Sequence, residues 1–376
     1  MSGRRKKEKQ KKFFDYSLLF LIIFLLGFGL VMLYSVSAYE AQSEFGDATY
    51  YLRHQVRNIL IGLVCMAGMS AIPYLFWKKL WVSRGVYVLS LLLCIAVIAV
   101  GNDANGSQRW LEIGPISFQP SEIAKVAVII YLAAVLSRMP KQIKDFKTIL
   151  KILLRVAPII AVIAVSNLST AIIVAGICVL MMFVASPKYS HFLVLAILVV
   201  AMGAIFILTQ SYRSDRIMAW LHPEDYPDQA YQTLQGLYAI GSGGLFGKGL
   251  GASIQKLGYV PEAQNDFIFS IICEELGLFG AICVILLFVL LIWRFMIIAN
   301  NAADLFGSMI VVGVLSHISL QVVLNLAVVT NSMPNTGVIL PFISYGGTSM
   351  IILLAEMGLV LSVSRGIRLD SDYPTQ

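Results

Sequence analysis

The chain has 376 residues, of which 58% are hydrophobic and only 13% charged, and its mean hydropathy is +0.81. Soluble domains carry roughly 25% charged residues, so a water-soluble fold cannot hide this much apolar surface. The net charge of +7 does not indicate a nucleic-acid-binding protein, because the basic residues gather mostly on one side of the predicted membrane helices. We therefore expect an integral membrane protein without a nucleic-acid partner.

Apolar runs that can cross a bilayer recur along the chain. A helix needs roughly 20 apolar residues to span the hydrocarbon, and the runs predict an all-α, polytopic fold of about ten transmembrane helices. The predicted organisation is a basic tail over residues 1–15, a membrane domain over 16–366 and a second tail over 367–376. The expected spans lie at about 16–36, 56–73, 84–100, 122–137, 152–166, 169–186, 191–210, 267–293, 305–330 and 346–364.

The first apolar run follows the basic segment MSGRRKKEKQKK, which resembles the start of a secretory signal. The run is too long for a signal peptide and lacks a clear cleavage site of small residues, so we expect a retained first helix. Lys and Arg concentrate in alternate loops. The positive-inside rule then places both termini in the cytoplasm.

Cysteine and histidine spacing argues against a metal site built from these residues. The five cysteines all fall within predicted spans and form no CxxC pair. The four histidines are scattered without HExxH-like spacing. We therefore predict no zinc or histidine metal site and no disulfide framework.

Two places interrupt the regular alternation of spans and short loops. The longest loop, 211–266, is predicted to lie outside and contains the glycine-rich segment YQTLQGLYAIGSGGLFGKGLG. Long structured loops are usually functional. The polar turn 166–170 joins two short apolar runs, and irregular backbone at that depth requires surrounding protein or a water-filled cavity. Both places are therefore candidate parts of a site.

The motif QPSEIAK places Glu122 and Lys125 at i and i+3 near a predicted outer helix start. This spacing puts both on one helix face, where they can neutralise each other. One interpretation is a structural ion pair that ties spans together; another is a polar wall of a substrate cavity. The two interpretations are compatible.

The motif PEAQNDFIFSIICEELG places Asp266 at the end of the long loop. A carboxylate at this border can serve as a general base. The alternative is a helix N-cap, a position that Asp favours. Glu274 and Glu275 follow on faces about 100° apart, so at most one of them shares a cavity with Asp266, and we take both as structural.

Basic residues on the predicted external loops suit a diphosphate-bearing lipid. The alternative is a solvated loop whose cations meet lipid headgroups. The glycine-rich GSGGLFGKGLG fits neither a P-loop nor a dinucleotide-binding motif. The candidate substrate-binding cations are Arg109, Arg213, Arg216 and Lys248.

Five long motifs occur in one order along the chain: GSQRWLEIGPISFQPSEIAK, YRSDRIMAWL, YQTLQGLYAIGSGGLFGKGLG, VPEAQNDFIFSIICEELGLFG and LPFISYGGTS. In this order they resemble the SEDS family (shape, elongation, division and sporulation), which includes FtsW, RodA and SpoVE. The resemblance runs from about residue 16 to 366, and the stretch KLGYVPEAQNDFIF is most similar to the FtsW or SpoVE type.

The resemblance implies a peptidoglycan glycosyltransferase that polymerises lipid II, an undecaprenyl diphosphate-linked disaccharide peptide. It implies that the chain works on the outer face of the bacterial cytoplasmic membrane, with a class B penicillin-binding protein transpeptidase as partner. The family's proposed catalytic carboxylate falls on Asp266, and its QPSE...K pair falls on Glu122 and Lys125. Asn167 and Ser344 are expected to line the same cavity.

The chain departs from the family pattern at two places. Members commonly read PEAHTDF where this chain has Gln264 and Asn265 before Asp266, so a possible acid-base histidine is missing. Many members carry PDLGT where this chain reads SNLST. Asn167 can hydrogen-bond there but cannot supply the charge of an acid.

The expected mechanism is inverting glycosyl transfer with Asp266 as base and with arginine, lysine or a divalent cation such as Mg²⁺ at the leaving group. Two other functions are open on the sequence: a transporter that flips lipid II, and a non-enzymatic division scaffold that recruits a transpeptidase. Polymerisation in detergent would separate the enzyme from the transporter, because flipping requires a sealed bilayer. A scaffold would not depend on Asp266.

Overall fold

The computed structural model describes residues 14–367, apart from 105–106, 114–115, 141, 187, 189–190, 193–196, 198–217 and 224. Its helices are α1 (Tyr16–Phe45), α2 (Tyr50–Ala71), α3 (Leu80–Val100), α4 (Pro120–Leu136), α5 (Phe146–Ser166), α6 (Leu168–Ala185), α9 (Pro227–Ser242), α10 (Ile268–Asn300), α11 (Leu305–Val329) and α12 (Gly347–Ser364), with short 3₁₀ turns at Tyr74–Phe76 and Gln142–Lys144. Seven of the helices in the described part are long and apolar enough to cross a membrane.

These helices confirm the predicted all-α, polytopic membrane fold. Every predicted span except 191–210 contains a helix, and that one lies largely outside the described residues, as do residues 1–13 of the predicted tail. The sequence did not predict a small antiparallel sheet between α3 and α4, built from β1 (Asn102–Ala104), β2 (Ser107–Ile113) and β3 (Ile116–Phe118) in the order β1-β2-β3. β1 and β3 have three residues each, and the seven residues of β2 do not alternate apolar and polar, so the sequence shows no strand pattern.

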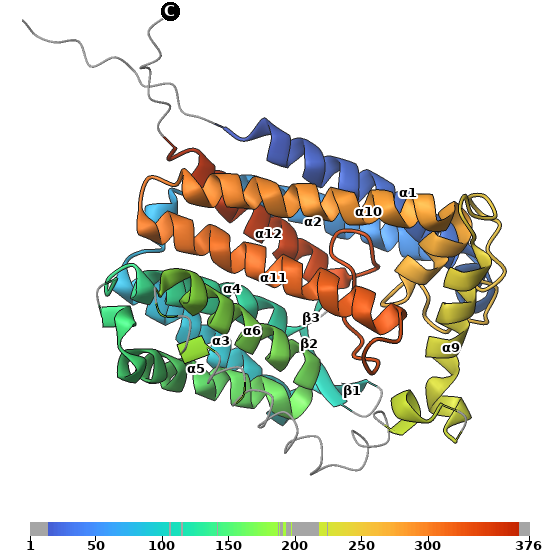
Figure 1. Cartoon of the computed structure of the whole chain (residues 1–376), viewed down its shortest axis with the longest axis horizontal. Helices are drawn as coiled ribbons and strands as arrows, with labels where there is room; N and C mark the ends of the chain where they lie inside the picture. Colours follow the sequence, from blue (N-terminus) through green and yellow to red (C-terminus); the bar gives the residue numbers. More distant parts are fainter. Residues whose placement is uncertain are drawn as a thin grey trace, which may run out of the picture.

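The helices form two groups that meet at α4. Helices α1, α2 and α10–α12 lie on one side and α3, α5 and α6 on the other (Figure 1). Helix α4 contacts α3, α6, α11 and α12, and almost every residue along it is buried. Pro120 lies in the first turn of α4, where the backbone N–H that proline lacks would have no partner within the helix. A polar side chain on α4 is therefore held inside the protein.

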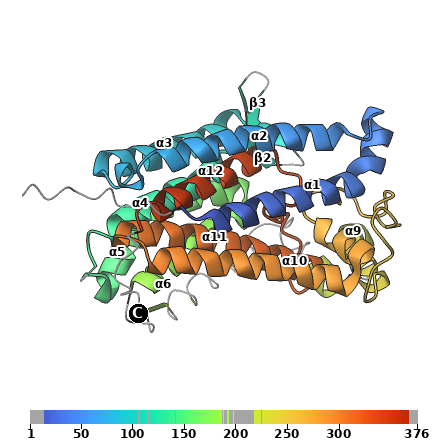
Figure 2. The ribbon, with the colours of Figure 1, turned by 90° about the horizontal axis from the view of Figure 1, so that it is seen from above.

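The two ends of the described chain lie at the same end of the bundle, and α9 lies at the opposite end (Figures 1 and 2). The guanidinium of Arg365 lies 5.2 Å from the ring centroid of Phe14, and Arg294 pairs with the buried Asp15 at 2.8 Å. The two described ends thus lie on one side, as the ten predicted spans would require.

Helix α10 is broken at Gly277, and the preceding loop repairs the break. Gly277 has φ 68° and ψ −168°, a conformation that only glycine adopts readily. The amides of Lys248 and Gly249 donate to the carbonyls of Glu274 and Glu275 at 2.9 Å. The amides of Leu278 and Phe279 donate in turn to the carbonyls of Gly244 and Leu245, at 2.9 and 3.0 Å. The helix bonds lost at the break are thus replaced by bonds to residues 244–249.

Gly277→Ala is expected to destabilise the protein. The new Cβ would meet the backbone of Gly247 and Leu245, and the backbone conformation alone costs a non-glycine residue about 1–3 kcal/mol. Thermal unfolding of the purified protein in detergent measures the effect. Gly85→Ala on α3 is the matched control, because open space surrounds Gly85 and alanine favours a helix. An unchanged midpoint for Gly277→Ala would contradict the described break.

Candidate active site

A polar cavity of about 520 Å³ opens where segments from distant parts of the chain meet. This volume lies within the usual range for small-molecule sites, roughly 300–1,000 Å³. The cavity lies among β2, the start of α4, the α5–α6 turn, α9, α11 and the loops before α10 and α12. Its lining includes Arg109, Trp110, Gln119, Glu122, Lys125, Asn167, Ser169, Thr170, Gln232, Glu262, Asn265, Asp266, Gln321, Asn335, Tyr345 and Ser349.

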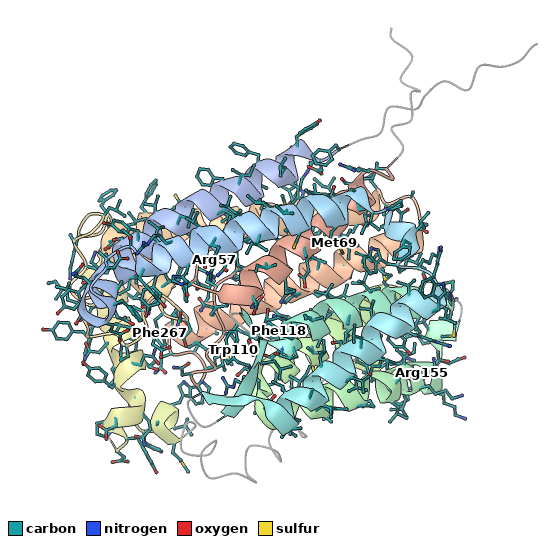
Figure 3. All side chains as sticks on the ribbon, turned by 180° about the vertical axis from the view of Figure 1, so that it is seen from behind. Arg57, Met69, Trp110, Phe118, Arg155 and Phe267 are labelled. Atoms are coloured by element: carbon teal, nitrogen blue, oxygen red, sulfur yellow. The ribbon has the colours of Figure 1, made fainter. Side chains whose placement is uncertain are left out.

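The small sheet contributes one wall of the cavity. Trp110 on β2 and Phe118 on β3 lie beside the helices, and β3 contacts α12 (Figure 3). The backbone N–H of Gln119, between β3 and α4, donates to the Thr348 hydroxyl at 3.4 Å. The sheet is therefore held against the start of α12.

Asp266 lines the cavity with 7% of its surface exposed. Helix α10 begins only at Ile268, with Phe267 at the N-cap position and no side-chain cap bond. The N-cap position of α10 is therefore occupied by Phe267 and not by Asp266.

Asn325 holds the backbone of Asp266 in place, and sequence reasoning missed it. This fully buried side chain of α11 donates to the Asp266 carbonyl at 2.7 Å and to the Val338 carbonyl at 2.8 Å. Asn325 thereby joins the loop before α10 to the loop before α12. An amide inside a predicted membrane span was the available signal.

Glu122 and Lys125 form an ion pair at 2.9 Å on the floor of the cavity. Lys125 is only 1% exposed, so its charge depends on Glu122 for compensation. Both residues also line the cavity. The pair is therefore both a buried ion pair and part of the cavity wall, as the two interpretations of the motif predicted.

The α5–α6 turn forms another side of the cavity. Asn167 is its single linking residue, and the Asn167 side chain accepts from the Thr170 amide at 3.1 Å, capping α6. The Arg109 guanidinium donates to the Ser166 carbonyl at 3.1 Å. An amide at position 167 therefore performs the cap without a charge, and Arg109 reaches the same turn.

Tyr345 adds a neutral polar group to the lining. Burial is the main cause that raises the pKa of its phenol above the ordinary value of 10.0. The hydroxyl therefore stays protonated at neutral pH and can donate a hydrogen bond.

Several predicted site residues lie elsewhere. Lys248 does not line the cavity, because its ammonium pairs with Glu274 at 2.6 Å. Ser344 is buried and does not line the cavity; its hydroxyl accepts from the backbone amide of Leu340 at 2.9 Å. Arg213 and Arg216 lie outside the described residues.

Gln264, at the position of the family's usual histidine, does not line the cavity. It is buried and donates to the Glu40 carboxylate on α1 at 2.8 Å. A side chain at this position therefore links the loop to α1, so the sequence departure at Gln264 removes no group from the cavity lining.

The carboxylates do not gather as a metal-binding set. Among the residues that the structure describes, no three His, Cys, Asp or Glu side chains come together in a way that could hold a metal ion. The divalent cation expected from the sequence therefore has no ligand set in this part of the chain.

The sequence profile of the FtsW/RodA/SpoVE family, described as "Cell cycle protein", matches residues 16–369. The chain belongs to this family. It is 39% identical to stage V sporulation protein E of Bacillus subtilis (strain 168), over 93% of this chain and 97% of that protein. It is 36% identical to a protein named "Probable peptidoglycan glycosyltransferase FtsW" of Geobacter sp. (strain M18), over 94% of this chain and 98% of that protein.

Solved structures in the FtsW/RodA/SpoVE family have the same fold. The crystal structure of the rod shape determining protein RodA of Thermus thermophilus matches with a TM-score of 0.69 and 28% identity, over 95% of this chain and 98% of that one. A chain from the structure described as "Structural coordination of polymerization and crosslinking by a peptidoglycan synthase complex" matches with a TM-score of 0.77 and 27% identity, over 95% and 99%.

Lys125→Met is expected to lower stability by about 3–5 kcal/mol, because it leaves the Glu122 carboxylate buried without a counter-charge. The double variant Glu122→Gln/Lys125→Met removes both charges and should recover most of that loss. Thermal unfolding in detergent measures both variants. A double variant as unstable as the single one would show that charge compensation is not what the pair provides.

Proposed function

We propose that this chain is a peptidoglycan glycosyltransferase that polymerises lipid II into glycan strands on the outer face of the bacterial cytoplasmic membrane, during division, cell-shape growth or sporulation. One observation carries the proposal: a nearly buried carboxylate, Asp266, lies in a polar cavity with Lys125 and Arg109 in its lining. The names of the relatives, which include FtsW-type peptidoglycan glycosyltransferases, support the same activity.

Asp266 is the proposed general base. The 4-hydroxyl of one lipid-linked disaccharide attacks the anomeric carbon of the other strand, and Asp266 accepts the hydroxyl proton. The new C–O bond forms as the bond from the anomeric carbon to the diphosphate oxygen breaks. The polyprenyl diphosphate leaves with that electron pair, and the sugar carbon inverts.

Cations in the cavity lining suit the leaving diphosphate. Lys125 and Arg109 are the described candidates, and fixed positive groups stabilise charge that develops in a water-poor site. Arg213 and Arg216 stay predictions for the same role. A divalent cation at the leaving group stays a prediction from the sequence.

A second cavity of about 260 Å³ adjoins the first. Gln232 and Asn335 line both cavities, and the Asn335 amide donates to the Gln232 amide oxygen at 2.8 Å between them. A polymerase must hold two substrates at once, and two neighbouring cavities support that requirement better than they support a carrier with one binding site.

The partner and the topology extend the proposal. We expect a class B penicillin-binding protein transpeptidase as partner, and a structural relative is part of a peptidoglycan synthase complex. The basic loops favour cytoplasmic termini, and the two described ends of the chain do lie at one end of the bundle. The cavity would then face outward, where the lipid II headgroup is.

Asp266→Asn is expected to abolish polymer formation from purified lipid II in detergent while leaving the fold intact. The change keeps the size of the side chain and removes the base, and general bases contribute about 10²–10⁴ to rate. Gel analysis of glycan strands measures the product. Glu262→Gln, which neutralises another carboxylate of the cavity, is the control and should retain most activity.

The same assay separates the rival functions. Retained polymerisation by Asp266→Asn would reassign the base. If the unaltered protein makes no polymer in detergent but moves lipid II across sealed vesicles, the chain is a flippase. If it does neither and supports division only through partner recruitment, it is a scaffold.

A further inference from the structure

The segment 243–260 leads to the loop that carries Asp266. It exposes most of its large apolar side chains and buries polar ones. Its large apolar side chains mostly point outward: Phe246 is 80% exposed, Leu245 65%, Leu250 56% and Ile254 53%. Leu257 and Tyr259 are exposed too, whereas Ser253 and Lys256 are buried. A water-facing loop shows the opposite pattern, because exposed contiguous apolar surface is unfavourable in water.

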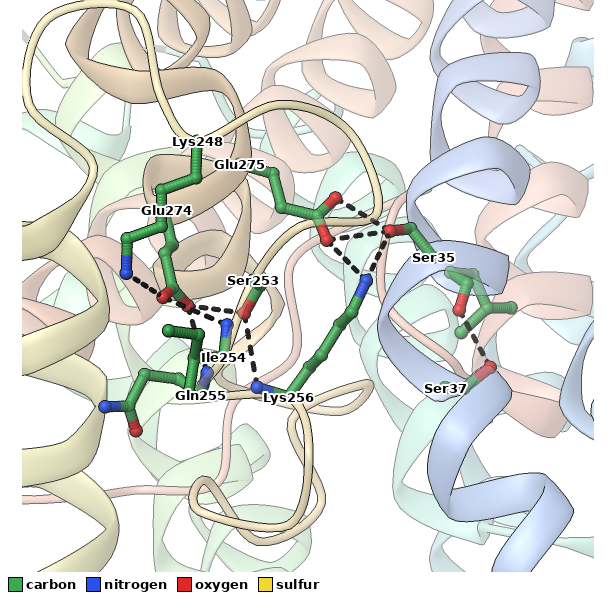
Figure 4. A network of polar contacts seen from close by, with 10 residues as sticks. Ser35, Ser37, Lys248, Ser253, Ile254, Gln255, Lys256, Glu274 and Glu275 are labelled. Atoms are coloured by element: carbon green, nitrogen blue, oxygen red, sulfur yellow. Dashed lines mark hydrogen bonds and ion pairs between the residues drawn. The ribbon is translucent and has the colours of Figure 1, made fainter.

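Both charged side chains of this segment pair with buried carboxylates of α10. The Glu274 carboxylate, 0% exposed, pairs with Lys248 and accepts from the Ser253 hydroxyl and from the amides of Ile254 and Gln255 at 3.2 and 3.3 Å (Figure 4). The neighbouring Glu275, also 0% exposed, pairs with Lys256 at 2.7 Å. Both lysines therefore direct their charge into the protein.

The segment is attached at the depth of the bilayer. It bonds to α10 at residues 274–279, and Glu274 lies about 10 Å inside the predicted start of that span at residue 267, at about 1.5 Å per residue. On the other side, the Lys256 ammonium donates to the Ser35 hydroxyl at 3.2 Å (Figure 4). Ser35 lies at the end of the predicted span 16–36, and its hydroxyl also donates to the Glu275 carboxylate. The attachment therefore lies between the outer boundary of the predicted spans and about 10 Å below it. Irregular backbone at this depth needs its polar groups paired, and the four bonds across the break at Gly277 provide part of that pairing.

We propose that residues 243–260 form a re-entrant segment whose exposed apolar side chains lie among the lipids of the leaflet on the α9 side of the membrane. Interfacial elements typically bury their apolar face about 5–10 Å into the headgroup and acyl boundary. The Glu274–Lys248 and Glu275–Lys256 pairs keep charge away from that lipid. The segment is thus a membrane-binding surface additional to the spanning helices.

The apolar surface of the segment continues into the membrane-facing side of α10. Leu278 and Phe279, directly after the break, are 52% and 65% exposed, and Ile282 and Leu286 follow further along the helix. α10 is itself a candidate span. One apolar surface therefore runs from the helix onto the loop, which favours lipid as the occupant over a soluble protein.

Spin labelling of the full-length protein in lipid nanodiscs tests this proposal. Cys65 and Cys283 are the cysteines that are not buried, so a Cys65→Ser/Cys283→Ser background receives single cysteines by Phe246→Cys, Leu250→Cys or Ile254→Cys. The lipid control is native Cys283, exposed on α10, in a Cys65→Ser variant. The water control is Ser43→Cys at the exposed end of α1.

The ratio of collisions with apolar O₂ to collisions with polar Ni-EDDA reports the environment of each label. At 246, 250 and 254 we expect a ratio severalfold above that at 43 and close to that at 283. A ratio equal to that at 43 would overturn the proposal, and so would low collision rates with both reagents, which indicate cover by protein. Water access that a purified transpeptidase partner then blocks would also overturn it and assign the surface to that partner.

Discussion

Compensation of buried charge is the constraint on which the rest of the structure depends. A charge in an apolar bundle must meet an opposite charge or a set of hydrogen-bond donors. Four lysine or arginine pairs meet this need in the described part: Lys125–Glu122, Lys248–Glu274, Lys256–Glu275 and Arg294–Asp15. Three of them join segments far apart in the chain or in different elements. The pairs therefore fix which loops lie against which helices, and this placement builds the cavity.

The position of Asp266 follows from this arrangement. The loop before α10 follows the segment that Lys256 fixes to Glu275. At the other end of the loop, Asn325 on α11 donates to the Asp266 carbonyl. Gln264 ties the middle of the loop to Glu40 on α1. A short loop fixed at three points leaves its carboxylate little freedom, which is the pre-organisation that a general base requires.

Hydropathy and local spacing were sufficient for the spans that the structure describes and for the Glu122–Lys125 pair, because both depend on residues close in the sequence. The environments of Lys248, Ser344 and Gln264 depend on contacts with distant segments, and the sequence carries no local sign of them. Asn325 is a polar residue within a predicted span, but its two acceptors lie on different loops, so the sequence does not show what it binds. The small sheet was missed because β1 and β3 have three residues each and β2 does not alternate apolar and polar residues. The break in α10 was missed because a single glycine inside a helical pattern is usually tolerated, so Gly277 alone does not predict a break.

The repaired break at Gly277 also bears on biogenesis. A ribosome makes residues 244–249 before it makes α10, so the groups that complete the helix already exist when α10 enters the bilayer. In an isolated α10 the carbonyls of Glu274 and Glu275 would lack donors in the hydrocarbon. The amides of Leu278 and Phe279 would lack acceptors. The helix and its upstream loop are therefore one unit of insertion, and neither can be exchanged between relatives without the other.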